Sequence, residues 1–323
     1  MRILSGVQPS GKLHLGNYFG AIKQHLQLQE EGEAFYFIAD YHALTTVHDK
    51  KAVEEYTMEV AIAYLALGID PNKVVFFRQS DVPEVCELAW LLGCTIGLGL
   101  LERAHSYKDK IAKGIKPSFG LFAYPVLMAA DILAYKSDVV PVGKDQVQHV
   151  EMTQDMAQAF NYRYGEVFKR PEAKLSKSAR VPGIDGQKMS KSYGNTIEIF
   201  ASKKDLKKSV MRIVTDSKPL GSSLDPDSCN VFKLYSLFAG KEERTQMDET
   251  YRSGEIGYGD AKKKLLLKIE EYFSEARDRR EDLLKRPDFV QDVLRQGARK
   301  ARETAFKTVQ EARDAVGLGP RIF

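Results

Sequence analysis

The chain has 323 residues, of which 43% are hydrophobic and 28% charged, so it can bury a sizeable core and is expected to form two units. Its formal net charge of +4 permits nucleic-acid binding without arguing for it, because a modest excess of Lys and Arg is common on ordinary enzymes. The three widely spaced cysteines, Cys86, Cys94 and Cys229, exclude a disulfide framework and a CxxC zinc site. We therefore expect a reduced, cytoplasmic protein with no structural metal.

Neither export nor membrane insertion is expected. Residues 1–6 lead directly into a strand and a turn, and they lack the cationic, apolar and small-residue regions of a signal peptide. No apolar run reaches the roughly 18–20 residues that span a bilayer. The sequence therefore predicts a soluble protein with no membrane partner.

Up to about residue 165, short apolar runs alternate with longer stretches of helical spacing. The β-branched and aromatic runs are typical of buried parallel strands and lie at residues 3–4, 34–39, 74–77 and 139–142. Helices are predicted between them, over residues 18–28, 53–67 and 85–92. This alternation predicts an α/β domain with a doubly wound, Rossmann-like parallel sheet, whose ligands bind at the carboxyl ends of the strands.

From about residue 196 the pattern changes to a helical one. Lys, Arg and Glu become dense, and residues 260–285 and 289–316 are each predicted to form one long amphipathic helix. We therefore expect a Rossmann-like catalytic domain over residues 1–195 and an all-helical domain over residues 196–290. A C-terminal helix over residues 291–323 is expected to pack back on the first domain.

The first candidate motif follows the first predicted strand. Gly6–Lys12 is rich in turn formers and leads into His14-Leu15-Gly16-Asn17 at the start of a helix. The free N–H groups and partial positive charge of a helix start suit a polyphosphate. Gly16 lets a ring or ribose approach the backbone, while His14 and Asn17 share a face and can point donors at phosphate oxygens. Taken alone, these four residues are more typical of a capped strand-to-helix connection with a surface histidine than of a phosphate-binding site.

The second candidate motif is Lys188-Met189-Ser190-Lys191-Ser192, a basic, hydroxyl-rich string among glycines at positions 183, 186 and 194. A mobile loop with two ammonium groups could close over a triphosphate as charge develops. Such strings are more often exposed basic loops. A similar string, Lys174–Ser178, lies shortly upstream, and composition does not choose between the two. We favour the later one because glycines bracket it.

An apolar helix is predicted over residues 124–133, and it carries a single acid, Asp131. A buried carboxylate is costly unless a donor binds it. An indole N–H of a ligand could serve, with Met128 packed on the ring, and pairing with a neighbouring base is equally compatible. Next along the chain, residues 140–146 end a strand and present Asp145 for ribose hydroxyls and Gln146 for an amino acid's polar end.

Six segments, taken together, resemble the bacterial tryptophanyl-tRNA synthetases of class I. They occur in matching order over most of residues 1–217 and comprise SGVQPSGKLHLGN, IADYHALT, YPVLMAADI, PVGKDQ, KMSKS and IVTDS. The resemblance implies ATP-dependent activation of L-tryptophan and its transfer to a terminal ribose hydroxyl, the 2′ hydroxyl, of tRNA(Trp). It also implies Mg²⁺ carried by the nucleotide, a homodimer, and anticodon reading by the helical domain.

The resemblance also implies roles for individual residues. Catalysis would use His14, Asn17, Lys188, Ser190 and Lys191. ATP would contact Gln8, Pro9, Ser10, Gly16, Asn17, Lys110, Gly143, Lys144, Asp145, Val181, Lys188, Met189, Ser190, Lys191 and Ser192. Tryptophan would contact Gly6, His42, Tyr124, Met128, Asp131, Val140, Val142 and Gln146. Without the resemblance, His42 is a satisfied histidine at a strand end, Val181 is simple packing, and Lys110 is part of a solvated helix face.

Several features depart from the family pattern. Leu4 stands where relatives often carry phenylalanine, and Tyr193 follows KMSKS where acids are frequent. The linker from Val181 to Lys188 is short, and the chain lacks the cysteines for the iron–sulfur cluster of some members. Two alternatives stay open: a tyrosyl-tRNA synthetase, which shares both motifs, and a catalytically inactive RNA-binding relative. A basic face for phosphates is offered by Lys203, Lys204, Lys207, Lys208 and Arg212, although such runs are usually only solvated.

Overall fold

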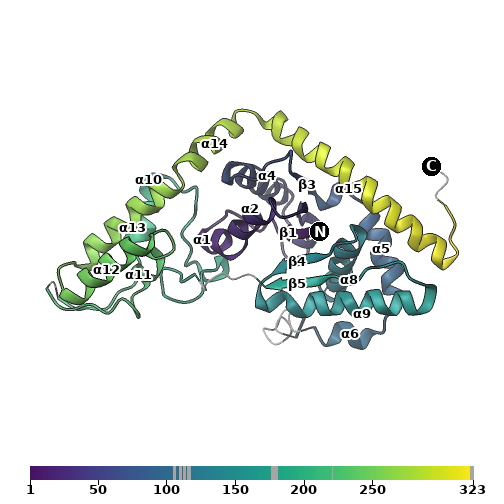
Figure 1. The fold of residues 1–323 in the computed structure, drawn as a ribbon, viewed down its shortest axis with the longest axis horizontal. Helices are drawn as coiled ribbons and strands as arrows, with labels where there is room; N and C mark the ends of the chain where they lie inside the picture. The colour runs from purple at the N-terminus through teal and green to yellow at the C-terminus, as the bar shows by residue number, and fades with distance from the viewer. Residues whose placement is uncertain are drawn as a thin grey trace. The chain divides into compact units, whose positions relative to one another are not determined.

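The structure is a computed structural model that describes residues 1–104, 107–108, 111, 114, 118–175, 181–219 and 221–320. The chain forms two compact units (Figure 1). Unit 1 contains residues 1–11, 25–176 and 283–323, and unit 2 contains residues 12–24 and 177–282. This division differs from the expected boundaries, because residues 12–24 and 177–195 belong to unit 2.

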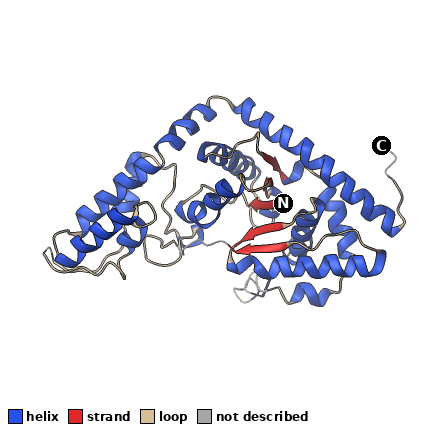
Figure 2. Cartoon of the chain, viewed as in Figure 1, coloured by secondary structure: helices blue, strands red, loops and turns tan. Residues whose placement is uncertain are grey.

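Unit 1 is built on a five-stranded, fully parallel sheet in the order β3-β2-β1-β4-β5 (Figure 2). The strands are β1 (Arg2–Val7), β2 (Glu33–Ile38), β3 (Val74–Arg78), β4 (Val139–Val142) and β5 (Glu172–Leu175). The predicted Rossmann-like class is confirmed. Because the chain leaves β1 toward β2 on one side and returns to β4 on the other, the sheet has a switch point, where such folds bind ligands.

Helices cover this sheet, and their ends follow ordinary capping chemistry. Unit 1 contains α3 (Asp40–Ala43), α4 (Lys50–Leu67), α5 (Glu84–Gly93), α6 (Leu98–Glu102), α8 (Phe119–Ala134) and α9 (Val147–Tyr164). Asp49 caps α4 by accepting from the Ala52 N–H at 2.8 Å, and Gly68 ends that helix with φ of 111°. Ser118 caps α8 through the Leu121 N–H.

The long helix α15 (Pro287–Val316) packs along β3. Small residues allow the close approach, since a Cβ at Gly297 would overlap the carbonyl oxygen of Phe76. Arg302 also reaches the fully buried Glu84 of α5 with an N–O distance of 2.8 Å. Such a buried carboxylate needs its partner, so this ion pair fixes where α15 lies on unit 1.

Unit 2 begins with α1 (Leu15–Asn17) and a π-helical turn (Tyr18–Ile22), which runs on into α2 (Lys23–Leu28) at the border with unit 1. Its other helices are α10 (Lys203–Met211), α11 (Asn230–Tyr235), α12 (Lys241–Ser253), α13 (Tyr258–Tyr272) and α14 (Ser274–Leu284), the last of which ends in unit 1.

The single helix predicted over residues 260–285 is wrong. The chain breaks at Phe273, whose backbone leaves the helical region while its ring is buried against Tyr18 and Phe238. Tyr272 adds a hydroxyl contact of 3.0 Å with Tyr18. The aromatic cluster thus stabilises two shorter helices over one continuous helix. Among the described residues, no helix is both long and apolar enough to cross a bilayer.

The contact between α15 and β3 predicts a large cost for a small added group. Gly297→Ala should lower the free energy of unfolding by about 3 kcal/mol, because backbone atoms of Phe76 cannot move aside as a flexible side chain could. Urea unfolding would measure the change. Gly93→Ala in α5 is the control, since its Cβ meets open space and should not destabilise unit 1. Equal stability of the two variants would contradict this packing.

Candidate active site

The two motifs lie side by side within unit 2. A short antiparallel pairing joins the first motif to residues 197–199, which follow the second motif: Leu15 N donates to Ile197 O at 3.0 Å, and Ile199 N donates to Leu13 O at 3.1 Å. A Cβ at Gly16 would lie 3.4 Å from the Cβ of Met189. The same Cβ would lie 2.9 Å from the imidazole ring of His14, so it is that ring that requires glycine at position 16.

His14 is 6% exposed, so the alternative of a surface histidine is wrong. Burial, followed by the nearby charge of Lys191, lowers the pKa of His14 to about 4. The imidazole is therefore neutral near pH 7, and it can offer a polar N–H but no positive charge. The His14 backbone N–H donates to Asn17 Oδ1 at 3.1 Å, so the Asn17 oxygen caps this turn and only its amide nitrogen can donate elsewhere.

The second motif is one arm of a tight hairpin. Met189 N donates to Val181 O at 3.0 Å, and Gly183 N donates to Gln187 O at 2.7 Å. The short linker noted in the sequence is the turn of this hairpin, with Gly186 at φ of 84°. Val181 and Met189 are both buried, so each anchors one strand of the hairpin.

The polar residues of the hairpin differ in their exposure. Lys188 and Ser192 are exposed, whereas Ser190 and Lys191 are half-buried. Burial lowers the pKa of Lys191 to about 8, and the opposing charge of Glu198 raises it in part. The hydroxyls of Ser190 and Ser192 lie 2.9 Å apart. This arm combines a solvated ammonium with a partly desolvated one, an arrangement suited to binding a polyanion.

The upstream string that resembles the second motif has a different environment. Lys174 belongs to β5 and pairs with Glu31 at 2.8 Å. Residues 176–178 of that string lie outside the described residues, as does Lys110.

In unit 1, Asp131 of α8 is 2% exposed and held by two side chains. Gln79 Nε2 donates to both carboxylate oxygens at 2.8 Å, and His42 Nε2 lies 2.9 Å from Oδ2. Burial raises the pKa of the Asp131 carboxyl, while His42 and then Gln79 lower it in part. The neighbouring base that the sequence allowed is therefore present, and it is His42.

Two more rings lie near this carboxylate. The hydroxyl of Tyr124, on α8, lies 2.5 Å from His149 Nε2 of α9, and its ring lies edge-on to His42. The structure thus brings Asp131, His42 and Tyr124 together. Met128, between Tyr124 and Asp131 on the same helix, is half-buried.

Two residues of this site, Gln79 and His149, were not predicted from the sequence. Both are buried polar residues. Gln79 directly follows β3, and the carboxyl end of a strand in a sheet of this kind was the available signal. His149 lies in the first turn of α9, shortly after Gln146, and no spacing distinguished it from a core residue.

Three of the remaining candidates for the amino-acid site lie on strands of the sheet, and the fourth lies in the turn after β4. Val140 and Val142 are buried in β4. Gly6 in β1 is exposed and lies beside the ring of Phe37, which a Cβ would meet at 2.5 Å. Gln146 is half-buried just before α9. Leu4, where the sequence departs from the family, is a buried core residue of β1.

The nucleotide-binding candidates of unit 1 lie in two loops. In the first, Pro9 is buried and Ser10 exposed, while Gln8 Nε2 donates to the carbonyl oxygen of His42 at 3.1 Å. In the second, Lys144 and Asp145 are exposed, and the Asp145 carboxylate lies against Gly143, where a Cβ would meet Oδ1 at 2.7 Å. Gly143 is thus required for this conformation of Asp145. The second loop follows β4 directly, at the carboxyl edge of the sheet.

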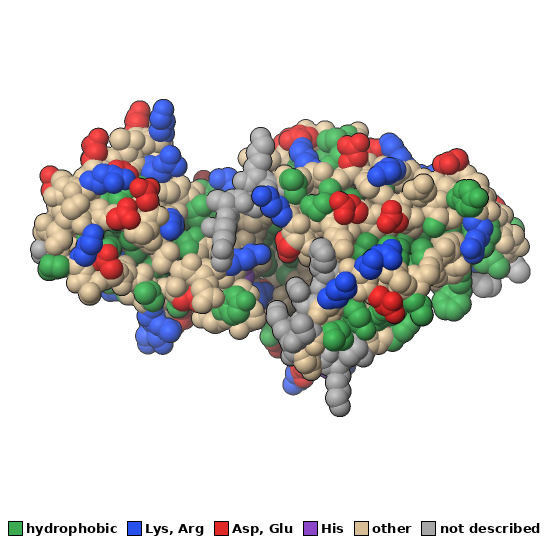
Figure 3. All heavy atoms as spheres, turned by 90° about the horizontal axis from the view of Figure 1, so that it is seen from below, with side chains coloured by type: hydrophobic (Ala, Val, Ile, Leu, Met, Phe, Trp, Pro, Cys, Tyr) green, Lys and Arg blue, Asp and Glu red, His purple; other side chains and the backbone are tan. Residues whose placement is uncertain are grey.

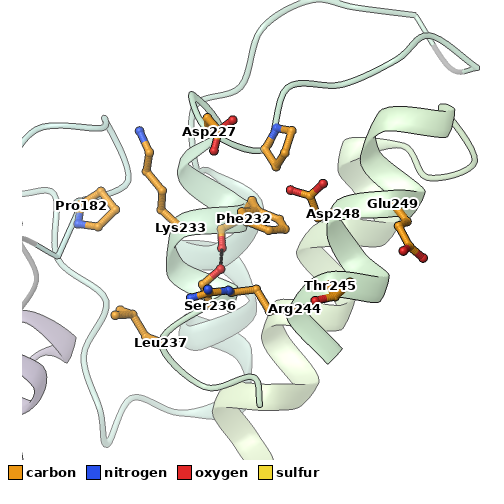
Figure 4. A pocket seen from close by; sticks show the side chains of 11 residues that line it. Pro182, Asp227, Phe232, Lys233, Ser236, Leu237, Arg244, Thr245, Asp248 and Glu249 are labelled. Carbon is orange, nitrogen blue, oxygen red and sulfur yellow. Dashed lines mark hydrogen bonds between the residues drawn. The ribbon is translucent and has the colours of Figure 1, made fainter. Parts of the chain in front are cut away.

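Unit 2 also contains a hollow of about 800 Å³ (Figure 4). Phe232 and Lys233 of α11 line it together with Arg244 of α12. Its lining includes three acids, of which two are paired with Arg252. An aromatic ring beside two cations is chemistry that suits an unpaired nucleotide. Among the described residues, no group of three or more His, Cys, Asp or Glu side chains could hold a metal ion.

The chain is similar to known proteins over nearly its whole length. The family model for tRNA synthetases class I (W and Y) matches residues 1–274. A tryptophan–tRNA ligase of Fusobacterium nucleatum is 55% identical, with 100% of this chain and 99% of the relative covered. One from Rhodopirellula baltica is 54% identical, over 98% of this chain and 100% of the relative.

A solved structure is also similar over nearly the whole chain. The tryptophanyl-tRNA synthetase of Campylobacter jejuni, complexed with ADP and tryptophan, has a TM-score of 0.93 and 50% identity, with 98% of this chain and 100% of that chain covered. The similarity in sequence and in fold therefore extends over nearly the whole chain, well beyond the motifs.

Proposed function

This chain belongs to the class I tRNA synthetases for tryptophan and tyrosine, and from that premise we propose that it is a tryptophan–tRNA ligase. It activates L-tryptophan with ATP to form tryptophanyl-adenylate and pyrophosphate, and then transfers tryptophan to tRNA. The observation that carries the choice of amino acid is the buried carboxylate of Asp131, held by Gln79 and His42.

The pairing of Asp131 with His42 leaves room for the substrate. An ionised carboxylate offers about four lone-pair sites, and the hydrogen bonds to Gln79 and His42 account for three of them. We assign the fourth to the indole N–H of tryptophan. Because the carboxylate is already oriented, it need not reorganise when the ligand binds. Gly6, Tyr124, Met128, Val140, Val142 and Gln146 complete the proposed pocket.

The side chain of phenylalanine has no hydrogen-bond donor for the Asp131 carboxylate. A site built around such a hydrogen bond can reject a substrate that lacks the donor by about 10⁴-fold or more. Tyrosine remains the alternative substrate, because its hydroxyl could also donate to Asp131. The relatives that cover nearly the whole chain carry the tryptophan name, which favours tryptophan.

The first step needs no general base, because the tryptophan carboxylate is already ionised near pH 7 when it attacks the α-phosphorus. Catalysis comes from alignment and charge stabilisation. In unit 2, Lys188 and Lys191 neutralise charge on the departing pyrophosphate, and Ser190, Asn17 and neutral His14 supply polar groups. Mg²⁺ enters as part of the ATP substrate, and no step is assigned to it.

Each unit, taken by itself, offers further candidate residues for the nucleotide. In unit 2 these are Gly16, Val181, Met189 and Ser192. In unit 1 they are Gln8, Pro9, Ser10, Gly143, Lys144 and Asp145, with Lys110 carried over from the family alone. The second step is attack by the 2′ hydroxyl of the terminal tRNA ribose on the mixed anhydride, as in the class.

The anticodon-reading role falls to the helices of unit 2. Lys203, Lys204, Lys207, Lys208 and Arg212 are exposed on or just after α10, where they can meet phosphates. The hollow lined by Phe232, Lys233 and Arg244 offers a place for an unpaired base. Free Cys86, Cys94 and Cys229 are compatible with residence in the cytoplasm.

The assignment of Asp131 predicts the amino-acid dependence of ATP–pyrophosphate exchange. The wild-type protein should exchange with tryptophan but only weakly with tyrosine or phenylalanine. Asp131→Ala should lower kcat/KM for tryptophan by about 10²-fold or more, because it removes a charged hydrogen-bond partner. Ile132→Val on the same helix is the control for a change in the core. If exchange with tryptophan survives Asp131→Ala nearly intact, the assignment is wrong.

The half-buried ammonium of Lys191 predicts a pH dependence. A lysine whose pKa is about 8 is charged below that pH and loses its charge as the pH rises through it. At saturating tryptophan, kcat/KM for ATP should therefore fall above about pH 8. Lys191→Arg, whose guanidinium stays protonated, should move that fall to higher pH even if activity is lower. An unchanged profile would show that another group titrates.

We also propose that the protein is a homodimer, as in the family, through a face of unit 1. Trp90 of α5, Leu98 of α6 and Phe119 of α8 are 73%, 68% and 83% exposed, and α5 and α6 both pack against α8. Hydrophobic side chains gather along one edge of unit 1 in Figure 3. Exposed apolar faces of this kind commonly mark interfaces.

Trp90→Glu should convert the dimer to a monomer, because the charge would be buried without a partner. Sedimentation equilibrium would measure the mass. Leu267→Glu on α13 of unit 2, at a site that is also exposed and apolar, should leave the mass unchanged. A wild-type protein that is monomeric would refute the proposal.

A further inference from the structure

One buried asparagine holds the second motif in shape. Asn195 is 2% exposed, and its side chain uses both polar atoms inside the hairpin of residues 181–189 and the turn that follows it. Nδ2 donates to Asp185 Oδ1 at 2.8 Å and to Lys188 O at 3.2 Å. Oδ1 accepts from Ser190 N at 2.8 Å. The carboxamide thus contacts the backbone on both sides of Met189.

The surroundings of Asn195 leave it little freedom. A Cβ at Gly183 would overlap its carboxamide, so that position must be glycine for the asparagine to fit. The Asn195 carbonyl oxygen accepts from Ile184 N at 3.0 Å, and Asp185 Oδ1 also accepts from Gln187 N at 3.0 Å. Both the side chain and the backbone of Asn195 therefore bind the hairpin.

The rest of unit 2 fixes the far side of the same hairpin. Val214 N donates to Ile184 O at 2.7 Å, and a Cβ at Gly186 would meet Asn230 Nδ2, at the start of α11, at 2.6 Å. These contacts hold the turn of the hairpin, and they do not reach its lysines. The backbone at Lys188 and Ser190 is held by the Asn195 carboxamide, and Lys191 follows directly.

We propose that Asn195 is a positioning residue for the activation step, which sets the backbone of the arm so that the ammonium groups of Lys188 and Lys191 meet the phosphates. The inference rests on the proposed function. Asn195 touches no reacting atom, and it acts through the main chain of the residues that do. Asp185 is its partner, because it supplies the acceptor that orients the carboxamide.

A positioning residue and a purely structural residue have different effects on the kinetics when they are replaced. A structural asparagine would affect stability and every activity in proportion to the folded fraction. A positioning residue affects the rate of adenylate formation, while tryptophan binding by unit 1 stays intact. Misplacing catalytic groups by about 1 Å can cost about 10²-fold in rate.

The test uses Asn195→Asp, which keeps an acceptor for Ser190 N but turns the donor into an oxygen that faces the Asp185 carboxylate. We expect kcat for tryptophan-dependent ATP–pyrophosphate exchange to fall by about 10²-fold. The dissociation constant of tryptophan without ATP should be unchanged. Transfer of tryptophan from supplied tryptophanyl-adenylate to tRNA should be unchanged too.

A second substitution distinguishes a lost contact from general damage. Adding Asp185→Asn to Asn195→Asp restores a donor and an acceptor between the two side chains, with their roles exchanged, so part of the lost rate should return. Val210→Ala is the stability control, since it removes buried volume from α10 of the same unit without touching the hairpin. It should lower the melting temperature but keep kcat.

The results of these experiments distinguish failure of the positioning role from failure of the proposed function. Loss of kcat in Asn195→Asp with intact tryptophan binding and partial rescue supports the positioning role. An unchanged kcat, or a loss shared equally with tryptophan binding and with Val210→Ala, overturns it. A wild-type protein that does not exchange with tryptophan overturns the proposed function instead.

Discussion

The short pairing of residues 13–15 with residues 197–199 is the constraint on which the geometry of unit 2 depends. Two segments that are far apart in the sequence become neighbours through two backbone hydrogen bonds. Gly16 then lies against Met189, and His14 is close enough to Lys191 for each to share the same desolvated surroundings. The unit therefore carries a preformed set of polar groups, which need not be gathered from separate parts of the chain when a polyanion binds.

That proximity has a consequence for charge. Burial disfavours the charged form of each group, the charge of Lys191 lowers the pKa of His14 further, and Glu198 raises that of Lys191 in part. His14 is consequently neutral near pH 7, and Lys191 has a pKa of about 8. A bound polyphosphate favours the protonated lysine, so binding near or above pH 8 is coupled to proton uptake by linkage. Neutral His14 avoids adding a further positive charge beside Lys191.

The sequence predicted the elements whose signal is local. β1 to β4 are apolar runs, and their parallel arrangement follows from the helices between them. β5 was missed because its residues, Glu172–Leu175, carry charge and lie at the edge of the sheet, where no apolar run is needed. The break at Phe273 was missed because it depends on rings from Tyr18 and Phe238, which helical periodicity does not contain.

The same distinction applies to the site. The two sequence motifs pointed to His14, Lys188 and Lys191. The residues that orient functional side chains belong to no recognisable motif. Gln79 is one example, because only the folded chain shows its amide donating to Asp131.

The buried acid shows why its orienting partners matter as much as the acid itself. Removing the carboxylate of Asp131 from water costs more than one weak hydrogen bond returns, so an unpartnered acid there would take up a proton or disturb the helix. Gln79 and His42 offset that cost before any ligand arrives. They also leave the carboxylate able to accept one further donor from a fixed direction. In the proposed function, selectivity comes from this acceptor, because the fold has already oriented it and a ligand without a donor cannot form the hydrogen bond.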